Sequence, residues 1–379
     1  MEVIKINPSE YDASDSSDRR RLSRRITPAI RILRKGGIAA FPTETVYGLG
    51  VLATDADAVQ RLRVLKGRPK SPFTVHISKP SEVRWYVRDV PVLARALIYK
   101  AWPGPATILL PVDSEFPKRT LRNRDLYNRI SPNGIVGLRC PDDPVAQILL
   151  EKPGKPILAT SANLAGQKPA TSNKEVIRKL DEKIDVLIDA GPTRYRKAST
   201  IVSFYRDGYR IVREGVYNAN AIARLTSRRI LFVCTGNTCR SPMASALTRK
   251  MLTEQIGCKE DELERFGQEI LSAGVRAISG SGVSDNAIRA VAKLGGRLEE
   301  HRARKLTSQL INWADVIFCM CRRHIDEIIQ KVPDAAGKTF LLDEGNDIED
   351  PIGGNLQTYL QVAKRIERNL KKRVKENLL

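Results

Sequence analysis

The sequence is poor in histidine, cysteine and aromatic residues, and it has no long apolar run. Its 379 residues include 3 His, 6 Cys and 6% aromatic side chains. Six cysteines in a chain of this length do not make a disulfide framework, which favours the cytoplasm. No apolar stretch approaches the ~20 residues that span a bilayer, and the opening residues lack the apolar region of a signal peptide. We therefore expect a cytoplasmic protein with no membrane association.

Positively charged residues are in clear excess over negatively charged ones. Lys and Arg number 64 and Asp and Glu 43, for a formal net charge of +21. Such a surface raises the chance of nucleic-acid contact, but it is also what sites for ATP, pyrophosphate or phosphate require. The basic residues are scattered and are not interleaved with aromatics. Tight RNA binding is therefore not expected, whereas a weak tRNA contact stays open.

The pattern of helices and strands predicts two α/β domains. The length exceeds what one ordinary core accommodates. Residues 1–217 mix helices with strands, and adjacent strands near 200–213 indicate hairpins, so a mixed sheet is expected. Residues 228–379 alternate strictly between strand and helix, which predicts a Rossmann-like parallel sheet with helices on both faces. Residues 218–227 are predicted to be the linker.

The strongest chemical motif is VCTGNTCRSP, at 233–242. A buried strand is expected to end at Cys234 and a helix to begin at Ser241, so loop N–H groups gather at a helix N-terminus, where anions bind. Arg240 can hold two phosphate oxygens at once. The same field is expected to lower the pKa of Cys234 and make it a nucleophile for phosphorus, with Asn237 bracing the turn. The other residues of this phosphate loop are Thr235, Gly236, Asn237, Thr238, Cys239 and Ser241.

A nucleophile of this kind needs an acid that protonates the leaving group. The segment EDPIGG, at 349–354, offers Asp350 in a loop before the last predicted helix. The adjacent Glu349 is the competing candidate.

These features resemble the low-molecular-weight phosphotyrosine phosphatase family. Cys-x5-Arg-Ser, SAGV at 272–275, HRARKLT at 301–307 and the late Asp–Pro occur in the family's order. The resemblance covers 228–379 and implies a flavodoxin-like fold without a cofactor. It also implies a phosphocysteine on Cys234, stabilisation of the transition state by Arg240, and Asp350 as acid and then as base for water.

Two details bear on the substrate of this half. Thr238 stands where tyrosine-directed members usually carry an apolar residue, and Ile352, Gly353 and Gly354 replace the tyrosine pair of an aryl pocket. Both details resemble the bacterial protein-arginine phosphatases, although those usually have Phe where this chain has Ile352. A phosphorylated protein is the expected substrate, with phosphoarginine favoured. Phosphotyrosine, or sensing of phospho-ligands without turnover, are the alternatives.

Zinc binding and a disulfide are the competing interpretations of the cysteines. A zinc site is disfavoured because Arg240 would lie beside the metal and no Cys-x2-Cys pair exists, so no metal ligands are predicted. A Cys234–Cys239 disulfide is conceivable as a reversible redox brake. Core packing is expected for two further cysteines and a structural role for two histidines: Cys319, Cys321, His301 and His324.

The first half carries several short motifs, each with an ordinary explanation as a cap, a turn, a solvated face or a core histidine. Together they place hydroxyls, an amide and at least four cations at strand ends or in loops, as a site for a triphosphate and a small zwitterion requires. The motifs are FPTETVYGLG (41–50), LKGRPKSPFTVHI (65–77), WPGPATILL (102–110), VGLRCP (136–141), LATSANLAG (158–166), STIV (199–202) and VREG (212–215).

Their order and wording resemble the YrdC-like threonylcarbamoyl-AMP synthases over about 20–217. The resemblance implies a twisted mixed sheet that converts ATP, bicarbonate and L-threonine to threonylcarbamoyl-AMP and pyrophosphate, with Mg²⁺ on the ATP and tRNA-modification proteins as partners. Thr43 would lie at the threonine pocket, Arg139 beside the carboxylate or carbamate, and His76 near the small substrates. Phosphate or nucleotide contacts are implied for Lys66, Arg68, Ser161, Asn163, Ser199 and Arg213.

The sequence thus predicts a bifunctional enzyme, a synthase followed by a phosphatase. The alternative for the first half is an RNA-binding module without chemistry. The set of cations, hydroxyls and an amide argues against that alternative, because a generic RNA surface does not require it.

Overall fold

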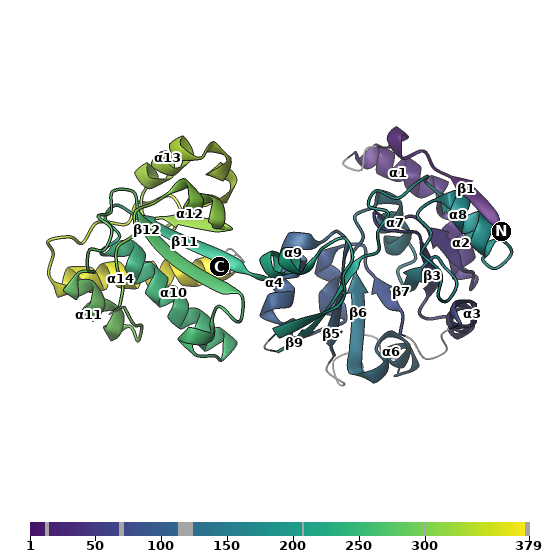
Figure 1. Ribbon diagram of the computed structural model, residues 1–379, viewed down its shortest axis with the longest axis horizontal. Helices are drawn as coiled ribbons and strands as arrows, with labels where there is room; N and C mark the ends of the chain where they lie inside the picture. The colour runs from purple at the N-terminus through teal and green to yellow at the C-terminus, as the bar shows by residue number, and fades with distance from the viewer. Residues whose placement is uncertain (12–14, 68–71, 113–123, 207, 299, 376–379) are drawn as a thin grey trace. The chain divides into compact units, whose positions relative to one another are not determined.

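The computed structural model describes residues 1–11, 15–67, 72–112, 124–206, 208–298 and 300–375. The chain divides into two compact units, Met1–Thr226 and Ser227–Leu379 (Figure 1). Both units are α/β, as predicted. Within these described ranges, no helix combines the length and the apolar character that a membrane span requires.

A mixed sheet forms the centre of the first unit, which confirms the predicted sheet type. The sheet contains parallel pairs, such as β1 (Glu2–Lys5) with β8 (Val186–Asp189), and antiparallel pairs, such as β3 (Gly48–Leu52) with β7 (Ile157–Ser161). In the described residues this sheet has ten strands, in the order β1 (Glu2–Lys5), β8 (Val186–Asp189), β2 (Ala39–Phe41), β3 (Gly48–Leu52), β7 (Ile157–Ser161), β4 (Thr74–His76), β6 (Ile135–Arg139), β5 (Ala106–Pro111), β9 (Thr200–Tyr205) and β10 (Gly208–Arg213).

Helices cover both faces of this sheet because successive strand residues point to opposite sides. In β2, Ala39 and Phe41 pack into one buried cluster and Ala40 into another. One face carries α1 (Ser16–Arg25), α2 (Thr27–Arg34) and α7 (Pro144–Glu151). The other carries α3 (Ala56–Lys66), α4 (Val92–Ala101), α6 (Arg124–Ile130), α8 (Asn173–Leu180) and α9 (Ala219–Thr226).

The residues predicted as a linker, 218–227, contain the whole of helix α9. Ile222 of α9 is fully buried and belongs to the core of the first unit. The Thr226 hydroxyl also donates to the Ile222 carbonyl, 2.9 Å away, in the last turn. The structure therefore assigns 219–226 to the first unit.

The second unit is built on a parallel sheet, as predicted. In the described residues it has four strands, all paired in parallel. Their order is β12 (Gln268–Gly274), β11 (Arg228–Cys234), β13 (Val316–Cys319) and β14 (Thr339–Leu341).

Helices lie on both faces of this sheet as well (Figure 1). In β11, Ile230 and Phe232 pack into a cluster with residues of three helices, whereas Leu231 and Val233 pack on the other side. The first group is α10 (Arg240–Ile256), α11 (Asp285–Lys293) and α14 (Leu356–Lys375), and the second is α12 (Ser308–Trp313) and α13 (Arg322–Lys331). Cys234 thus lies at the carboxyl end of a central strand, where α/β sheets bind ligands.

Candidate active sites

The cysteine of the phosphate loop lies between the end of β11 and the start of α10. Cys234 is 2% exposed, and its Sγ accepts a hydrogen bond from the Asn237 backbone N–H, 3.2 Å away. The Ser241 Oγ lies 2.9 Å from the same sulfur. The sulfur thus lies within hydrogen-bond distance of one backbone N–H and one hydroxyl group of the loop.

Asn237 braces the turn, as predicted from the sequence. Its φ of +55° is in the left-handed region, which Asn tolerates better than most side chains. Its side-chain nitrogen donates to Ser241 Oγ and Ser272 Oγ, both 2.9 Å away, and its Oδ1 accepts from the Arg304 N–H at 2.7 Å. All of its polar atoms therefore serve to hold the loop.

The expected lowering of the Cys234 pKa is not what this structure gives. Burial raises the pKa of the thiol. Hydrogen bonds from Ser241 and Asn237 and the charge of Arg240 oppose that increase. The sequence pattern reveals the donors but not the depth at which the sulfur is buried, and burial penalises a thiolate.

Arg240 links the loop to the predicted acid. Its Nη2 pairs with the Asp350 carboxylate, and its Nη1 donates to the Ile348 carbonyl at 2.9 Å. Glu349 instead pairs with Arg365, 3.1 Å away, and its side chain is 76% exposed. Of the two adjacent carboxylates, Asp350 is the one that faces the phosphate loop.

Two histidines contact the phosphate loop, a feature that the sequence analysis missed. His324 is almost fully buried and its Nε2 lies 3.0 Å from Thr235 Oγ1. His301 Nε2 lies 2.9 Å from the Asn237 carbonyl. Burial lowers the pKa of His324 to about 4, so it is neutral at physiological pH. Nothing in the local sequence signals these contacts, because each histidine is more than sixty residues away from the loop.

The remaining cysteines differ in environment. Cys319 is fully buried in the sheet core, as expected, whereas Cys321 is half-buried and its Sγ lies 3.3 Å from His324 Nδ1. All six cysteines are free. Cys239 Sγ lies 3.4 Å from the Tyr359 hydroxyl, and a Cys234–Cys239 disulfide stays a prediction. No three His, Cys, Asp or Glu side chains among the described residues form a group that could hold a metal ion.

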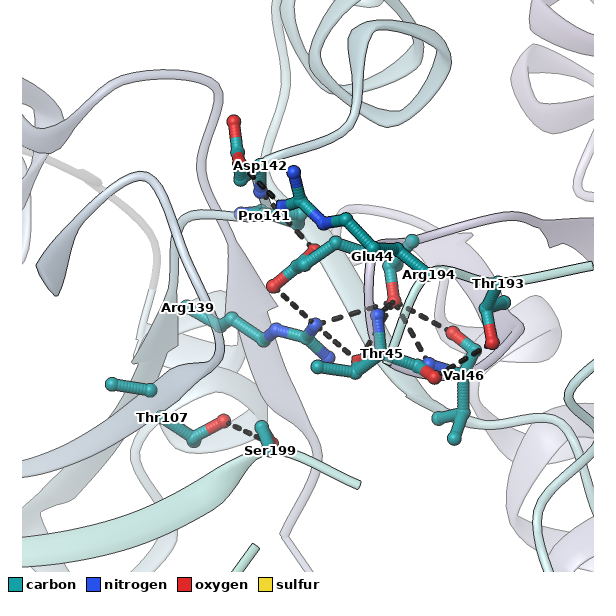
Figure 2. A network of polar contacts seen from close by, with 12 residues as sticks. Glu44, Thr45, Val46, Thr107, Arg139, Pro141, Asp142, Thr193, Arg194 and Ser199 are labelled. Carbon is teal, nitrogen blue, oxygen red and sulfur yellow. Dashed lines mark hydrogen bonds and ion pairs between the residues drawn. The ribbon is translucent and has the colours of Figure 1, made fainter. Parts of the chain in front are cut away.

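In the first unit, a buried arginine ties the PTET motif to the sheet (Figure 2). Arg139 ends β6, is 6% exposed, and its Nη2 donates to Thr43 Oγ1 at 3.2 Å and to Glu44 Oε1 at 3.0 Å. It also contacts Thr45 Oγ1. The other Glu44 oxygen accepts from the Asp142 N–H at 3.1 Å. The structure thus brings together the predicted Thr43 and Arg139, and it adds Glu44 and Thr45 to the site. The position of these two residues inside the PTET motif is the sequence feature that could have identified them.

One polar atom of Arg139 is left without a partner in the described residues. Its Nε is buried and makes no hydrogen bond. Buried donors are nearly always satisfied, so an orphan of this kind points to a group that it would bind. His76 is on the neighbouring strand β4, and burial together with the charge of Arg139 lowers its pKa to about 3.

A second polar cluster lies beside β5 and β9. Ser199 Oγ is 2.9 Å from Thr107 Oγ1, and Arg213 Nη2 donates to the Ser199 carbonyl at 2.8 Å. Burial and then the positive charge of Arg139 lower the pKa of Arg213, so the two guanidinium groups are near enough to repel each other. Arg139 of the VGLRCP motif and Arg213 of the VREG motif therefore belong to one electropositive region.

The third group of predicted residues forms a network of its own. The Lys66 ammonium is 2% exposed and donates to the Ser161 carbonyl at 2.8 Å and to Asn163 Oδ1 at 2.9 Å, and it also contacts the Asn163 carbonyl. Ser161 Oγ donates to Asn163 Oδ1 at 2.6 Å. Lys66 thus holds the loop after β7 in place, and phosphate binding by these residues stays a prediction. Arg68 lies outside the described residues.

Fold and site together define a fusion of two α/β units, one around a cysteine phosphate loop and one around a buried arginine. A family model for Sua5, YciO and YrdC proteins, described as "Telomere recombination", matches 31–215. A second model, described as "Low molecular weight phosphotyrosine protein phosphatase", matches 229–378.

Curated relatives agree with the first match. The threonylcarbamoyl-AMP synthase of Halorhodospira halophila is 36% identical over 165 residues, 43% of this chain and 82% of its own length. That of Bacillus subtilis is 36% identical over 196 residues, 50% of this chain and 53% of its own. The solved YwlE arginine phosphatase of Geobacillus stearothermophilus is 35% identical with a TM-score of 0.35, covering 39% of this chain and 92% of that one.

The chain belongs to the Sua5, YciO and YrdC family, the homologues of threonylcarbamoyl-AMP synthase, and its second half is a low-molecular-weight phosphatase domain. It spans about half the length of the first curated synthases that it matches, 53% and 50%.

Proposed function

We propose that the chain joins a threonylcarbamoyl-AMP synthase to a cysteine-dependent protein phosphatase. The observation that carries the first assignment is the buried Arg139, which is held by Thr43 and Glu44 and keeps an unpartnered Nε. The observation that carries the second is Cys234 Sγ within hydrogen-bond distance of Asn237 N and Ser241 Oγ.

In the synthase reaction, the amine of threonine attacks bicarbonate and water leaves, which gives a carbamate. A carbamate oxygen then attacks the α-phosphorus of ATP, and the bond to pyrophosphate breaks. Arg139 would neutralise the threonine carboxylate or the carbamate, and Arg213 would stabilise charge on the phosphates. Positioning and fixed positive charge supply the catalysis, so no side-chain acid is required.

Magnesium would enter as MgATP, that is, as part of the substrate. Glu44 is the carboxylate in contact with Arg139, and its two oxygens accept from Arg139 and from the Asp142 N–H. The phosphates of ATP would therefore supply the ligands to Mg²⁺. His76 would serve as a neutral neighbour of the small substrates, because its pKa is lowered to about 3.

Release of pyrophosphate tests the synthase assignment. We expect the purified chain to release pyrophosphate from MgATP only when both L-threonine and bicarbonate are present. The double variant Arg139→Met, Glu44→Gln is the matched inactive variant, because it removes the guanidinium without leaving the Glu44 carboxylate buried and unpaired. No release, together with binding of tRNA, would favour the RNA-binding alternative. Release that is independent of threonine would refute the synthase assignment.

In the phosphatase reaction, Cys234 would attack phosphorus as a thiolate, which the hydrogen bonds from Ser241 and Asn237 and the charge of Arg240 stabilise, and the bond to the leaving group breaks. Asp350 gives its proton to the leaving oxygen or nitrogen, then takes a proton from the water that hydrolyses the phosphocysteine and frees phosphate. Arg240 would bind two phosphoryl oxygens through its planar fork. The order in which these residues act is the one that the family resemblance implies.

A phosphoarginyl protein is the proposed substrate. The residue after Asp350–Pro351 is Ile352, which is 70% exposed, and two glycines follow it, so no aromatic wall stands at this position. Thr238 adds a hydroxyl beside the loop. A site without an aromatic side chain at this position suits a guanidinium leaving group better than a phenol.

Turnover of matched phosphopeptides tests this proposal. We expect a higher kcat/KM for a phosphoarginine peptide than for the same peptide with phosphotyrosine, and none for Cys234→Ser. Preference for phosphotyrosine would refute the arginine assignment. Binding of either peptide without turnover would instead identify a phospho-ligand sensor.

A further inference from the structure

The second unit has a cavity apart from the phosphate loop. It has a volume of about 1130 Å³ and lies along the side of α10, beside 295–298 and 300–304. Three carboxylates line it, Glu260, Asp261 and Glu300. The cationic side chains that line it are twice as many: Arg249, Lys250, Lys259, Arg297, Arg302 and Arg304.

Much of this positive charge is not neutralised within the protein. Arg249 has an ion pair with Glu260 at 3.8 Å, and Lys250 has ion pairs with Glu254 at 3.7 Å and with Glu367 at 3.9 Å. No ion pair or side-chain hydrogen bond within the described residues involves the guanidinium groups of Arg297, Arg302 or Arg304. Burial lowers the pKa of Arg249, and the positive charge of Arg304 contributes to this decrease, whereas Glu260 and Glu264 oppose it. The cations of the cavity thus repel one another, and a multiply charged anion would relieve that repulsion.

Size and lining select the kind of anion. A cavity of this volume accommodates a ligand larger than one phosphate ion. No Phe, Tyr or Trp is among its lining residues, so there is no platform on which a nucleic-acid base would stack. Guanidinium groups bind phosphate oxygens in pairs. A compact polyphosphate fits these features better than an RNA strand.

The cavity is also connected to the phosphate loop through Asn237. His301 and Arg304 both line the cavity. His301 Nε2 lies 2.9 Å from the Asn237 carbonyl, and the Arg304 N–H donates to Asn237 Oδ1 at 2.7 Å. Ser272, another lining residue, accepts from the Asn237 side chain at 2.9 Å. A ligand that moves this wall would therefore move the residue that braces the loop.

We propose that this cavity binds the pyrophosphoryl group of a small polyphosphate, either free pyrophosphate or the polyphosphate tail of a nucleotide, and that the bound anion alters the phosphate loop through Asn237. The effect on turnover rests on the proposed phosphatase function, whereas the binding does not. The proposed synthase reaction both consumes and releases compounds of this class.

Cys258 provides a local reporter, because it is a half-buried free thiol that lines the cavity. The full chain is treated with N-ethylmaleimide in the presence of pyrophosphate, ATP, AMP or sodium chloride at equal ionic strength. Mass spectrometry then gives the alkylation rates of Cys258 and of Cys234 separately, so occupancy of the cavity and of the phosphate loop are distinguished. We expect pyrophosphate to protect Cys258 saturably, and AMP and chloride to leave it unprotected.

The nucleotide arm identifies the source of the anion. Protection by ATP as well as by pyrophosphate would show that the tail of a nucleotide enters, and protection by pyrophosphate alone would select the free anion. Either outcome supports the site. Equal effects of pyrophosphate and chloride, or protection by an RNA oligonucleotide where pyrophosphate gives none, would overturn it.

Paired charge variants complete the test. Arg297→Gln with Arg302→Gln should raise the pyrophosphate concentration for half-protection by about tenfold. The control is Arg322→Gln with Arg323→Gln on α13, which removes the same charge on the opposite face of the sheet and should change nothing. Unaltered protection in the first variant would refute the site.

Coupling to the loop is read from the kcat at saturating phosphopeptide, when the loop itself is filled by substrate. This kcat should change with pyrophosphate in the native chain and stay constant in the Arg297→Gln, Arg302→Gln variant. A constant kcat in the native chain would disprove the coupling, even if Cys258 is protected.

Discussion

The guanidinium of Arg240 pairs with the carboxylate of Asp350, although the two residues are 110 positions apart in the sequence. The phosphoryl oxygens of a substrate would need the same guanidinium. Asp350 and the substrate phosphate therefore compete for Arg240, and substrate binding would release the Asp350 carboxyl toward the leaving group. Asp350 can move in this way because its side chain is 41% exposed, whereas that of Arg240 is only 7% exposed.

The competition predicts that loss of the Asp350 charge lowers turnover but strengthens the binding of phosphate. In Asp350→Asn, the loss of the general acid should lower kcat by about 10²–10⁴-fold. Because the charged competitor for Arg240 is also lost, phosphate should inhibit the variant at lower concentrations. Steady-state kinetics with a phosphopeptide and a phosphate inhibition constant measure both effects. Glu349→Gln is the matched control and should leave both constants unchanged, since Glu349 pairs with Arg365. A larger loss in Glu349→Gln would reverse the assignment of the acid.

The Ser241 hydroxyl should govern how easily Cys234 ionises. Burial raises the pKa of Cys234 and the hydrogen bond from Ser241 opposes that increase, so Ser241→Ala should raise the pKa further. The pH dependence of Cys234 alkylation measures this, and its midpoint should move to higher pH. Ser245→Ala, one turn further along α10, makes the same chemical change and should leave the midpoint where it is. A midpoint that moves to lower pH in Ser241→Ala would contradict the arrangement.

The second unit was the more predictable half, because its chemistry is local in sequence. Cys234 and Ser241 are seven positions apart, and the alternation of strand and helix already places their loop at a sheet edge. The parts that sequence could not supply are contacts across the fold, such as His324 with Thr235. The sign of the Cys234 pKa shift was also wrong, since burial depends on packing from α10 and the sheet together.

The first unit was predicted in type but not in detail. Strands β3 and β1 carry weak strand patterns in the sequence, because two glycines interrupt GLGVL and only one residue of β1 is buried. Glu44 was passed over because a charged residue between threonines gives no indication that it is buried against Arg139. The motifs identify which residues gather, and the structure supplies their partners.

Breaking the Arg139–Glu44 pair should destabilise the first unit strongly. Their side chains are 7% and 1% exposed, so Arg139→Met leaves a buried, uncompensated carboxylate and should cost about 3–5 kcal/mol. Adding Glu44→Gln removes that charge and should recover part of the loss. Denaturant unfolding of the two single variants and the double variant gives the coupling free energy. Additive losses would show that the two side chains do not depend on each other.

Each unit has a buried histidine that should make it sensitive to acid. The pKa of His76 is lowered to about 3, so the unfolded chain binds a proton near its ordinary value of 6.5 while the folded chain does not. The first unit should therefore lose stability as pH falls from about 6.5 toward 3, by up to about 1.4 kcal/mol per pH unit.

His76→Gln should flatten this pH dependence in the first unit alone. His324, whose pKa is lowered to about 4, should have the same role in the second unit, so His324→Gln is the reciprocal control. Hydrogen exchange of peptides from β7 and β11 between pH 4 and pH 7, corrected for intrinsic rates, separates the two units. An equal effect of His76→Gln on both would refute the assignment.

The glycine of the SAGV segment should be essential for the phosphate loop. A Cβ on Gly274 would lie 2.5 Å from the Thr235 carbonyl oxygen and 2.8 Å from the Asn237 nitrogen, closer than real Cβ contacts. Both are backbone atoms of the loop, so no side chain can move to relieve the clash. Gly274→Ala should therefore displace the donors around Cys234 and lower kcat by about 10²-fold. The free energy of unfolding should fall by only about 1–3 kcal/mol.

Gly282→Ala is the matched control, since its nearest neighbour would be the Arg302 side chain at 4.0 Å. It should retain both turnover and stability. Phosphopeptide kinetics and thermal unfolding separate loop displacement from general unfolding, because only displacement abolishes turnover in a chain that stays folded at the assay temperature. Full activity in Gly274→Ala would mean that the loop tolerates a backbone shift, and the rigid cradle around Cys234 would then not be what selects phosphate.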